Sequence, residues 1–361
     1  MKTALICMLQ LHKNSGSART AFENIRYFLS RGYEVHVASL TMDKELISSM
    51  GAIPHKLLPF VKSTGLYRRK WYDWQVKRLR KKLKPSITLG HGDILEQDVV
   101  TLHNCVFLAS ELIHGKKLDP KHEMAITHGT LLRKHAFKKM IANSLLMKND
   151  TIQRFKIPAD EIHVVYPSVD TSVFHPRLEQ KNELRAKFNF PDKVIVSLVT
   201  SGNFKKRGLD VFNSALKLLE PKVRNQASFR VVGKVDPVLG DSPYIIFDPP
   251  MDQIEHYYNA IDIFVLPARI EEFGRVVLEA MASGLPVITT DKVGAAELIE
   301  GEARDYITPT ENPQALADAL TELILDPELR ARLGELNAKS ALKEAENLLF
   351  QKFDKVFKNY I

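Results

Sequence analysis

The sequence predicts an α/β protein made of two doubly wound domains, each with a parallel sheet. The chain has 361 residues, about the length of two domains of ordinary size. Of these residues 45% are hydrophobic and 26% are charged, which excludes disordered and low-complexity classes. Short apolar runs alternate with longer helical patterns, as in βα units, and this pattern restarts near residue 170.

The first domain is predicted to span residues 1–168. Its clearest helix is AFENIRYFLSRG (21–32), which ends at a glycine. We interpret the N-terminal TALICMLQL as a buried strand rather than a signal peptide, because Gln10, His12 and Lys13 interrupt its apolar stretch. Further strands are expected at 34–40, 86–90, 99–104, 138–144 and 161–169.

The second domain is predicted over 169–341 and begins with a polar linker. Buried strands and amphipathic helices then alternate, and a final amphipathic helix is expected at about 342–361. The expected strands are 193–202, 228–234, 261–268, 285–291 and 305–309. The expected helices are 210–220, 253–260, 274–284 and one that begins at 294, and the stretch 313–341 is expected to be helical.

The positive charge of the chain is concentrated in one segment. The formal net charge is +8, and residues 67–84 hold nine Lys or Arg and one Asp, so the remaining sequence has 42 residues of each sign. Placed on an α-helix, where successive residues are 100° apart, the segment is predicted to bury a narrow stripe of Tyr72, Val76, Leu79 and Leu83. The residues that we group as the basic aromatic patch are Tyr67, Arg68, Arg69, Lys70, Trp71, Trp74, Arg78, Lys81 and Lys82.

A face that combines aromatic rings with cations suits a membrane interface rich in anionic lipid. It also suits a phosphorylated, lipid-linked substrate. The alternative is that both tryptophans pack against neighbouring loops and the charges are merely solvated. Nucleic acid is not expected as a partner, because no recognition motif accompanies the charge.

Cysteine content and hydropathy restrict the compartment. Cys7 and Cys105 are the only cysteines, too few for a zinc cluster or a disulfide scaffold. No apolar run approaches the roughly 20 residues that span a bilayer. We therefore expect a cytoplasmic protein.

The most informative segment is IDIFVLPARIEEFGRVVLEAMASGLPVITTD (261–291). A buried strand is followed by a loop with Glu271, and a helix carrying Glu279 is expected to open at Gly274. Free backbone N–H groups and the positive dipole end at this helix start form an anion site, and Gly274 lets a phosphate approach the backbone. Eight residues of helix rise about 12 Å, so the two glutamates suit hydroxyls on two parts of one extended ligand.

This segment resembles the E-x7-E signature of the family-4 retaining glycosyltransferases, a family of the GT-B class. Glu271-Glu-Phe-Gly-Arg-Val-Val-Leu-Glu279 matches the pattern, and ASGLPVITTDKVGAAELI matches its usual continuation. The resemblance implies two Rossmann-like domains facing a central cleft. The first domain would bind the acceptor and the second the nucleotide sugar, and the final helix would cross back onto the first domain.

The resemblance also implies roles for the residues of the motif. Glu271 would contact hydroxyls of the donor sugar, and Glu279 would hold the ribose. Phe273, Gly274 and the neighbouring Arg275 would contact the sugar and the diphosphate.

SGNFKKRGLD resembles the family's diphosphate loop, with Arg207 before its glycine where the family usually has Lys. The Arg that the family places six residues earlier would fall near Ser201 or Gly202, which is a departure, and Lys205 or Lys206 is expected to substitute. A leaving nucleoside diphosphate needs such cations. The resemblance implies neither a metal nor another cofactor.

In the first domain, Gly16 lies in the loop that would face the donor phosphate and the acceptor. His103 follows a strand and matches the family's active-site histidine near the sugar carbon under attack. Ser144, in IANS, would lie by the cleft.

The expected function is therefore that of a retaining hexosyltransferase. SGNFKKRGLD and FRVVGK also resemble the lipopolysaccharide core glucosyltransferases of this family. The enzyme would thus move a sugar from a nucleotide sugar, expected to be a UDP-hexose, to a lipid-linked saccharide such as lipopolysaccharide core, at the inner face of the cell membrane. His103 and Glu271 would be its catalytic residues, in a front-face substitution. A sugar-nucleotide 2-epimerase of the same architecture and a non-catalytic binding protein are the alternatives.

Overall fold

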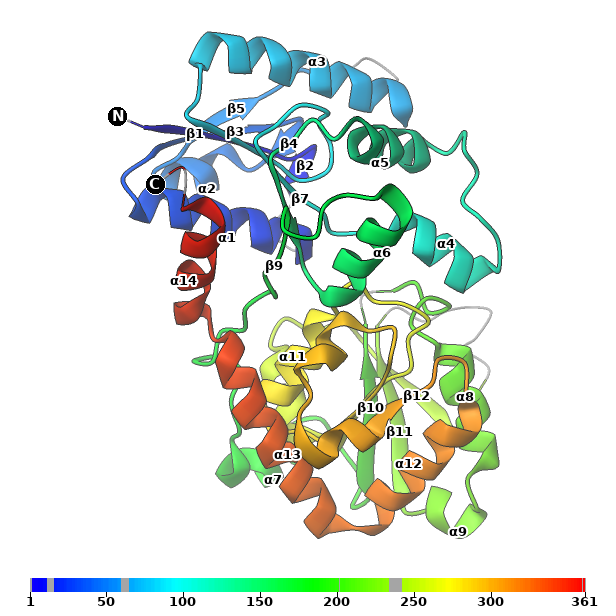
Figure 1. Ribbon diagram of the computed structural model, residues 1–361. Helices are drawn as coiled ribbons and strands as arrows, with labels where there is room; N and C mark the ends of the chain where they lie inside the picture. Colours follow the sequence, from blue (N-terminus) through cyan, green and yellow to red (C-terminus); the bar gives the residue numbers. More distant parts are fainter. Residues whose placement is uncertain are drawn as a thin grey trace. The chain divides into compact units, whose positions relative to one another are not determined.

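The computed structural model describes residues 2–11, 16–59, 65–200, 202–233, 242–358 and 360. Two compact units make up the chain: Met1–Tyr166 together with Phe350–Ile361, and Pro167–Leu349. Each unit is an α/β layer structure with a parallel sheet, so the predicted fold class is confirmed (Figure 1).

The described residues of the first unit form a seven-stranded sheet in which all neighbouring strands are parallel. The inner strands Thr3–Cys7, Ile87–Gly90 and Val99–Thr101 are short and almost fully buried, as expected where helices cover both faces of a parallel sheet. The edge strand Ile53–Lys56 is partly exposed. In sheet order the strands are β5 (Ile53–Lys56), β3 (Glu34–Ser39), β1 (Thr3–Cys7), β6 (Ile87–Gly90), β7 (Val99–Thr101), β8 (Lys139–Ala142) and β9 (Ile162–Val164). A second small pair joins β2 (Gln10–Leu11) to β4 (Thr41–Met42).

Helices α1 (Gly16–Ser30) and α3 (Leu66–Leu83) cover opposite faces of this sheet (Figure 1). The helix predicted over 67–84 is thus confirmed. Its buried stripe is also confirmed: Tyr72 and Val76 are buried, and the Tyr72 hydroxyl donates to the Ala38 carbonyl at 2.8 Å. The other helices of this unit are α2 (Lys44–Ser49), α4 (Val106–His114), α5 (Glu123–Lys134) and α6 (Leu145–Phe155).

The C-terminal helix α14 (Glu346–Phe357) packs against α1. The Tyr27 ring lies 5.3 Å from the rings of Phe353 and Phe357, centroid to centroid. Its hydroxyl donates to the Asp354 carboxylate at 2.9 Å, and Arg31 pairs with the same carboxylate. The last helical turns of the chain therefore complete the core of the first unit.

The described part of the second unit contains a six-stranded parallel sheet. Helices α8 and α12 pack together on one side of it, and α11 and α13 on the other (Figure 1). In sheet order the strands are β12 (Ile245–Asp248), β11 (Ala227–Val232), β10 (Val194–Val199), β13 (Ile263–Leu266), β14 (Val287–Thr290) and β15 (Ile307–Thr308). The helices are α7 (Lys181–Lys187), α8 (Leu209–Leu218), α9 (Pro221–Arg224), α10 (Ile254–Ala260), α11 (Arg275–Ala282), α12 (Pro313–Leu325) and α13 (Pro327–Ala341).

One expectation for the second unit is wrong. The helix expected from 294 is only a 3₁₀ segment, Gly294–Leu298. The helical structure expected over 313–341 is confirmed, and it is divided into two helices because Pro327 has no N–H to continue the first helix and its fixed φ suits a first helical position. Asp326 caps the new helix by accepting from the Leu329 N–H at 2.9 Å.

Candidate functional site

The strand order of the second unit reverses between β10 and β13. The chain moves from β10 towards β12 on one side, and from β13 towards β15 on the other. In open α/β sheets ligands bind at such a switch point, beyond the carboxyl ends of the strands. Two loops meet there, and we name them the Lys206 loop (202–208), after β10, and the Glu271 loop (267–274), after β13.

The Glu271 carboxylate faces the cations of the Lys206 loop. Arg207 forms an ion pair with Glu271, and the Lys206 Nζ lies 3.4 Å from the same carboxylate oxygen. Lys206 also pairs with Glu272 at 2.7 Å. These side chains are mostly buried, so their charges are poorly screened and an incoming ligand competes with existing ion pairs.

Burial raises the pKa of Glu271, while Arg207 and Lys206 oppose this shift. When a ligand binds, sugar hydroxyls can donate to the Glu271 carboxylate, and Lys206 and Arg207 can turn to phosphate oxygens. The cluster therefore has the groups that a sugar diphosphate needs: an acceptor for hydroxyls and two cations for phosphates.

The backbone of the Glu271 loop is fixed against the segment after β14. The Glu271 N–H donates to the Lys292 carbonyl at 2.9 Å, and the Gly294 N–H donates to the Glu271 carbonyl at 2.9 Å. The Phe273 carbonyl accepts from the Ala295 N–H at 2.7 Å. The loop thus presents its side chains from a rigid support.

Helix α11 begins at Arg275, directly after Gly274, whose φ of +88° is in the left-handed region that favours glycine. The helical geometry assumed between Glu271 and Glu279 is therefore wrong, because only Glu279 lies on the helix and Glu271 lies in the extended loop before it. Glu279 is buried and accepts from the Tyr258 hydroxyl at 3.4 Å. Arg275 donates to the Ser168 carbonyl at 3.1 Å, so its side chain braces the segment that opens this unit.

The remaining residues predicted for the diphosphate loop differ in position. Lys206 and Arg207 join Glu271, whereas the Lys205 side chain is exposed. Gly202 is described and is half-buried, and Ser201 lies outside the described residues.

In the first unit the strand order reverses between β1 and β6. Asp93, after β6, accepts from the Leu9 N–H at 2.9 Å, which ties the two strand ends together. His91, directly after β6, lies at this switch point. Its Nδ1 is 2.8 Å from the Nε2 of His103, and the planes of the two rings are 4° from parallel.

His91 is a candidate site residue that sequence reasoning missed. Burial lowers its pKa to about 4, so the ring is neutral at physiological pH and shares a single hydrogen with its histidine neighbour. The available signal was its place in SITLGHGD, immediately after an expected strand. His103 itself is half-buried just beyond β7.

The two other residues expected near the cleft begin helices. Gly16 is the first residue of α1, is exposed, and has open space around the position of a Cβ. Ser144 is buried and caps α6 by accepting from the Met147 N–H at 3.1 Å. The Ser144 hydroxyl therefore has a structural function as an N-cap.

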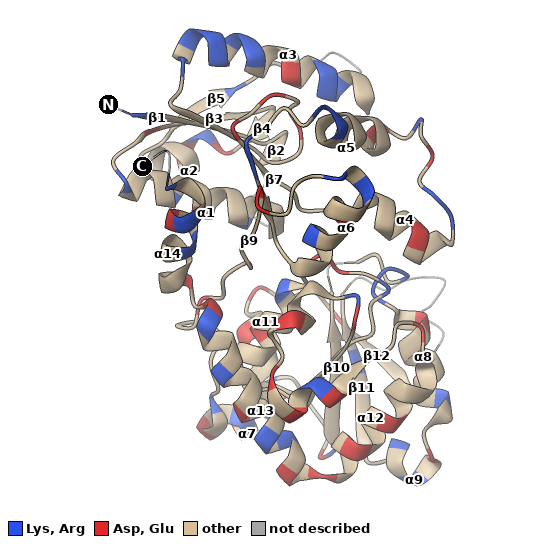
Figure 2. Ribbon diagram, in the orientation of Figure 1, with Lys and Arg blue, Asp and Glu red and all other residues tan. Residues whose placement is uncertain are grey.

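The basic aromatic patch lies on α3, where Figure 2 shows a dense run of Lys and Arg. Trp71 and Trp74 stack at 4.7 Å, and the Arg78 guanidinium lies 4.8 Å from the Trp74 ring centroid. Trp74, Arg78 and Lys81 line a groove of ≈ 540 Å³. Tyr67, Lys70 and Lys82 are exposed, and Arg68 is half-buried.

Arg69 does not belong to this exposed face, and the prediction that it does is wrong. Its guanidinium forms an ion pair with Asp93 and lies 3.9 Å from Glu123, with only 13% of its side chain exposed. The physical reason is that Asp93 needs a cation to offset the cost of its burial.

Two parallel-sheet Rossmann-like units, with a glutamate-and-cation cluster at the switch point of the second, define a protein of the GT-B class. Residues 14–173 match the family described as Glycosyltransferase Family 4, and residues 180–340 match Glycosyl transferases group 1. The chain belongs to the family-4 glycosyltransferases of the GT-B class.

Curated relatives are named as sugar transferases. The chain is 25% identical over 225 residues to a D-inositol 3-phosphate glycosyltransferase of Streptomyces scabiei, covering 57% of this chain and 50% of the relative. It is 27% identical over 218 residues to that of Streptomyces bingchenggensis, covering 55% and 48%. The chain thus spans about half the length of these curated relatives, and their names favour transfer over epimerisation.

Solved structures share the fold over nearly the whole chain. WaaG, a glycosyltransferase involved in lipopolysaccharide biosynthesis, has a TM-score of 0.78 at 20% identity, covering 98% of this chain and 99% of that one. Anabaena HepE in complex with UDP and glucose has a TM-score of 0.77 at 17% identity, covering 99% and 100%. At these identities the likeness establishes the fold.

Proposed function

We propose that the protein is a retaining glycosyltransferase that moves a hexose from a UDP-hexose to a lipid-linked saccharide. One observation carries this proposal: the Glu271 carboxylate, the Lys206 and Arg207 cations and the start of α11 lie together at the switch point of the second sheet. The second unit would hold the nucleotide sugar and the first unit the acceptor.

In the proposed reaction the bond between the sugar C1 and the diphosphate oxygen breaks. The acceptor oxygen forms a new bond to C1 on the same face, and its proton passes to the leaving diphosphate. Lys206, Arg207 and the amides that open α11 would stabilise the charge that develops on that diphosphate. Glu271 would orient the sugar, Glu279 the ribose, and His103 would lie near C1.

The choice of donor and acceptor rests on the relatives. HepE is described in complex with UDP and glucose, and WaaG as involved in lipopolysaccharide biosynthesis, which supports UDP-hexose and a lipid-linked saccharide for this chain. Lys205, Phe273, Gly274 and Arg275 would complete the donor site. Gly16 would contribute from the first unit.

A lipid-linked acceptor requires the enzyme to reach a membrane surface. Among the described residues, no helix is both long and apolar enough to cross a membrane. We infer that the exposed face of α3 contacts the anionic inner leaflet peripherally, because its stacked tryptophans and the lysines beside them combine an apolar and a cationic contact.

Donor binding tests the proposal first. Thermal unfolding is measured with UDP, GDP, ADP and their glucose conjugates, since a ligand that binds only the folded state raises the midpoint. Transfer from the best donor is then followed with lipid-linked saccharide and inositol phosphate acceptors, and NMR gives the anomeric configuration of the product. No stabilisation by any nucleotide, or an inverted product, would contradict the proposal.

A further inference from the structure

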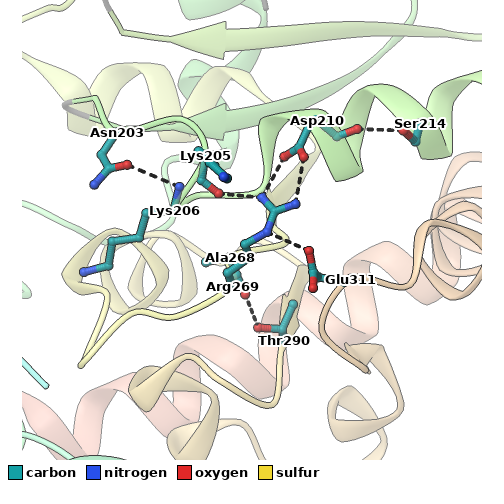
Figure 3. Close-up of polar contacts among 9 residues, drawn as sticks. All are labelled: Asn203, Lys205, Lys206, Asp210, Ser214, Ala268, Arg269, Thr290 and Glu311. Atoms are coloured by element: carbon teal, nitrogen blue, oxygen red, sulfur yellow. Dashed lines mark hydrogen bonds and ion pairs between the residues drawn. The ribbon is translucent and has the colours of Figure 1, made fainter. Parts of the chain in front are cut away.

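Arg269 lies in the Glu271 loop, two residues before Glu271, and its side chain is 92% buried. Figure 3 shows its guanidinium between the Lys206 loop, α8 and the loop before α12. Its Nη1 donates to the Lys205 carbonyl at 2.6 Å, and the two Nη atoms form a bidentate pair with Asp210 at 2.8 and 2.7 Å. Its Nε donates to Glu311 at 2.7 Å.

The backbone around Arg269 continues this set of contacts. The Arg269 N–H donates to the Lys206 carbonyl at 2.9 Å, so two successive carbonyls of the Lys206 loop are bound by one residue. The preceding Ala268 carbonyl accepts from the Thr290 hydroxyl at 2.7 Å, which fixes the Glu271 loop to the end of β14 (Figure 3). Arg269 therefore joins the loop that carries the cations to the loop that carries the carboxylate.

Only arginine suits this position. Its planar guanidinium offers five N–H donors in a fixed fork, which here serve a carbonyl and two carboxylates at once. A lysine ammonium has one flexible donor centre and cannot satisfy the bidentate pair with Asp210 and also reach Glu311. Glu311 has a φ of +59°, an uncommon left-handed conformation for a residue other than glycine, and its carboxylate is held by Arg269.

We propose that Arg269 is a positioning residue for the donor diphosphate. It holds the Lys206 loop so that Lys206 and Arg207 stand against Glu271, where the phosphates of a nucleoside diphosphate bind. This inference rests on the proposed function, because it assigns the Lys206 loop to the donor. Arg269 acts through that loop and does not itself contact the sugar.

The test compares the binding of UDP and UMP to the full-length protein by titration calorimetry. Misplacing two phosphate-binding cations should weaken UDP binding by about 10- to 100-fold in Arg269→Ala. UMP, which lacks the β-phosphate, should lose less than about 3-fold. Equal losses for both nucleotides, or unchanged UDP binding, overturns the proposal.

Three further variants make the result specific. Arg269→Lys and Glu311→Gln leave the sequence of the Lys206 loop unchanged, and each should show the same preferential loss for UDP at a smaller size, about 3- to 10-fold for Arg269→Lys. Arg332→Ala is the matched control, because Arg332 pairs with Glu302 in the same unit on an exposed surface. Should Arg269→Ala fail to fold, wild-type UDP binding by Arg269→Lys overturns the proposal.

The wild-type protein separates this inference from the function on which it rests. Failure of the wild type to bind UDP or any other nucleoside diphosphate counts against the proposed function. Normal UDP binding by the wild type with an unaltered Arg269→Ala counts against the role of Arg269 alone.

Discussion

The carbonyl oxygen of Pro267 occupies the space that a side chain at Gly208 would need. A Cβ built on Gly208 would lie 1.9 Å from this oxygen, and the φ of Gly208 is +71°. Pro267 opens the Glu271 loop and Gly208 ends the Lys206 loop, so the two halves of the proposed donor site meet here backbone to backbone. The glycine is required by this contact and by its conformation together.

Gly208→Ala should therefore displace the Lys206 loop as well as destabilise the second unit. The left-handed φ alone costs about 1–2 kcal/mol for a non-glycine residue, and the clash with backbone adds to it. Gly301→Ala is the matched control, since its φ is +60° but its nearest neighbour to a Cβ is a side-chain carbon at 3.8 Å. Chemical unfolding measures the loss of stability in both variants. Equal losses in Gly208→Ala and Gly301→Ala would show that the clash with Pro267 is relieved without cost.

Glu271→Gln should lower the transfer rate by about 100- to 1,000-fold. The amide has no negative charge with which to bind the sugar hydroxyls and to pair with Lys206 and Arg207. The fold should be retained, since the replacement has the same shape. Steady-state kinetics with saturating donor measures the loss, and circular dichroism checks the fold. Turnover within about 3-fold of wild type would remove Glu271 from the mechanism.

The local part of the candidate site could be predicted from the sequence. Strand β13, the Glu271 loop and helix α11 follow one another along 20 residues, and hydrophobic period and glycine position suffice to place them. The division of the helical stretch at Pro327 is likewise local, since proline disfavours a helix interior.

The rest depends on contacts between distant residues. The His91–His103 pair forms because β6 and β7 are neighbours in the sheet, and no local pattern encodes that pairing. Arg69 resembles its basic neighbours in sequence, and its side chain is buried only because it pairs with Asp93, 24 positions away. The Arg269 contacts likewise join residues 59 and 42 positions away.

Acid should destabilise the first unit through its buried histidines. Burial lowers the pKa of His91 and of His128 to about 4, below the ordinary value of 6.5. Between about pH 6.5 and 4 the unfolded chain binds more protons than the folded one, so stability falls as pH falls through this window. Each histidine contributes on the order of 3 kcal/mol to this loss.

The slope of the thermal midpoint against pH measures the effect. His91→Gln should flatten the slope below pH 6.5, and His114→Gln, at an exposed position, should leave it as in wild type. Parallel curves for wild type and His91→Gln would show that His91 is not buried neutral in the folded protein.

The C-terminal helix should be held by its aromatic contacts more than by its ion pair. Phe353→Ala removes a fully buried ring beside Tyr27 and should cost about 3–5 kcal/mol. Asp354→Asn, at the next position, weakens the pair with Arg31, whose side chains are 31% and 37% exposed, and should cost less than about 1 kcal/mol. Urea unfolding compares the two, and an equal or larger cost for Asp354→Asn would reverse this ranking.

The exposed face of α3 should bind anionic membranes through its lysines. Lys81→Gln combined with Lys82→Gln removes two exposed charges without touching the buried stripe. At about 1 kcal/mol per lysine near an anionic surface, the affinity should fall about 10- to 30-fold. Co-sedimentation with vesicles containing phosphatidylglycerol measures it, with purely phosphatidylcholine vesicles as the neutral reference.

The control is the same charge change placed elsewhere. Lys222→Gln combined with Lys339→Gln removes two lysines that are 78% and 67% exposed on the second unit. If binding responds only to net charge, both double variants lose affinity equally and the α3 face has no special role. A loss of vesicle binding confined to the α3 variant places the contact on this helix. Added salt should also lower the affinity of the wild type towards that of the α3 variant, because at 0.1 M salt charges more than about 10 Å apart are largely screened.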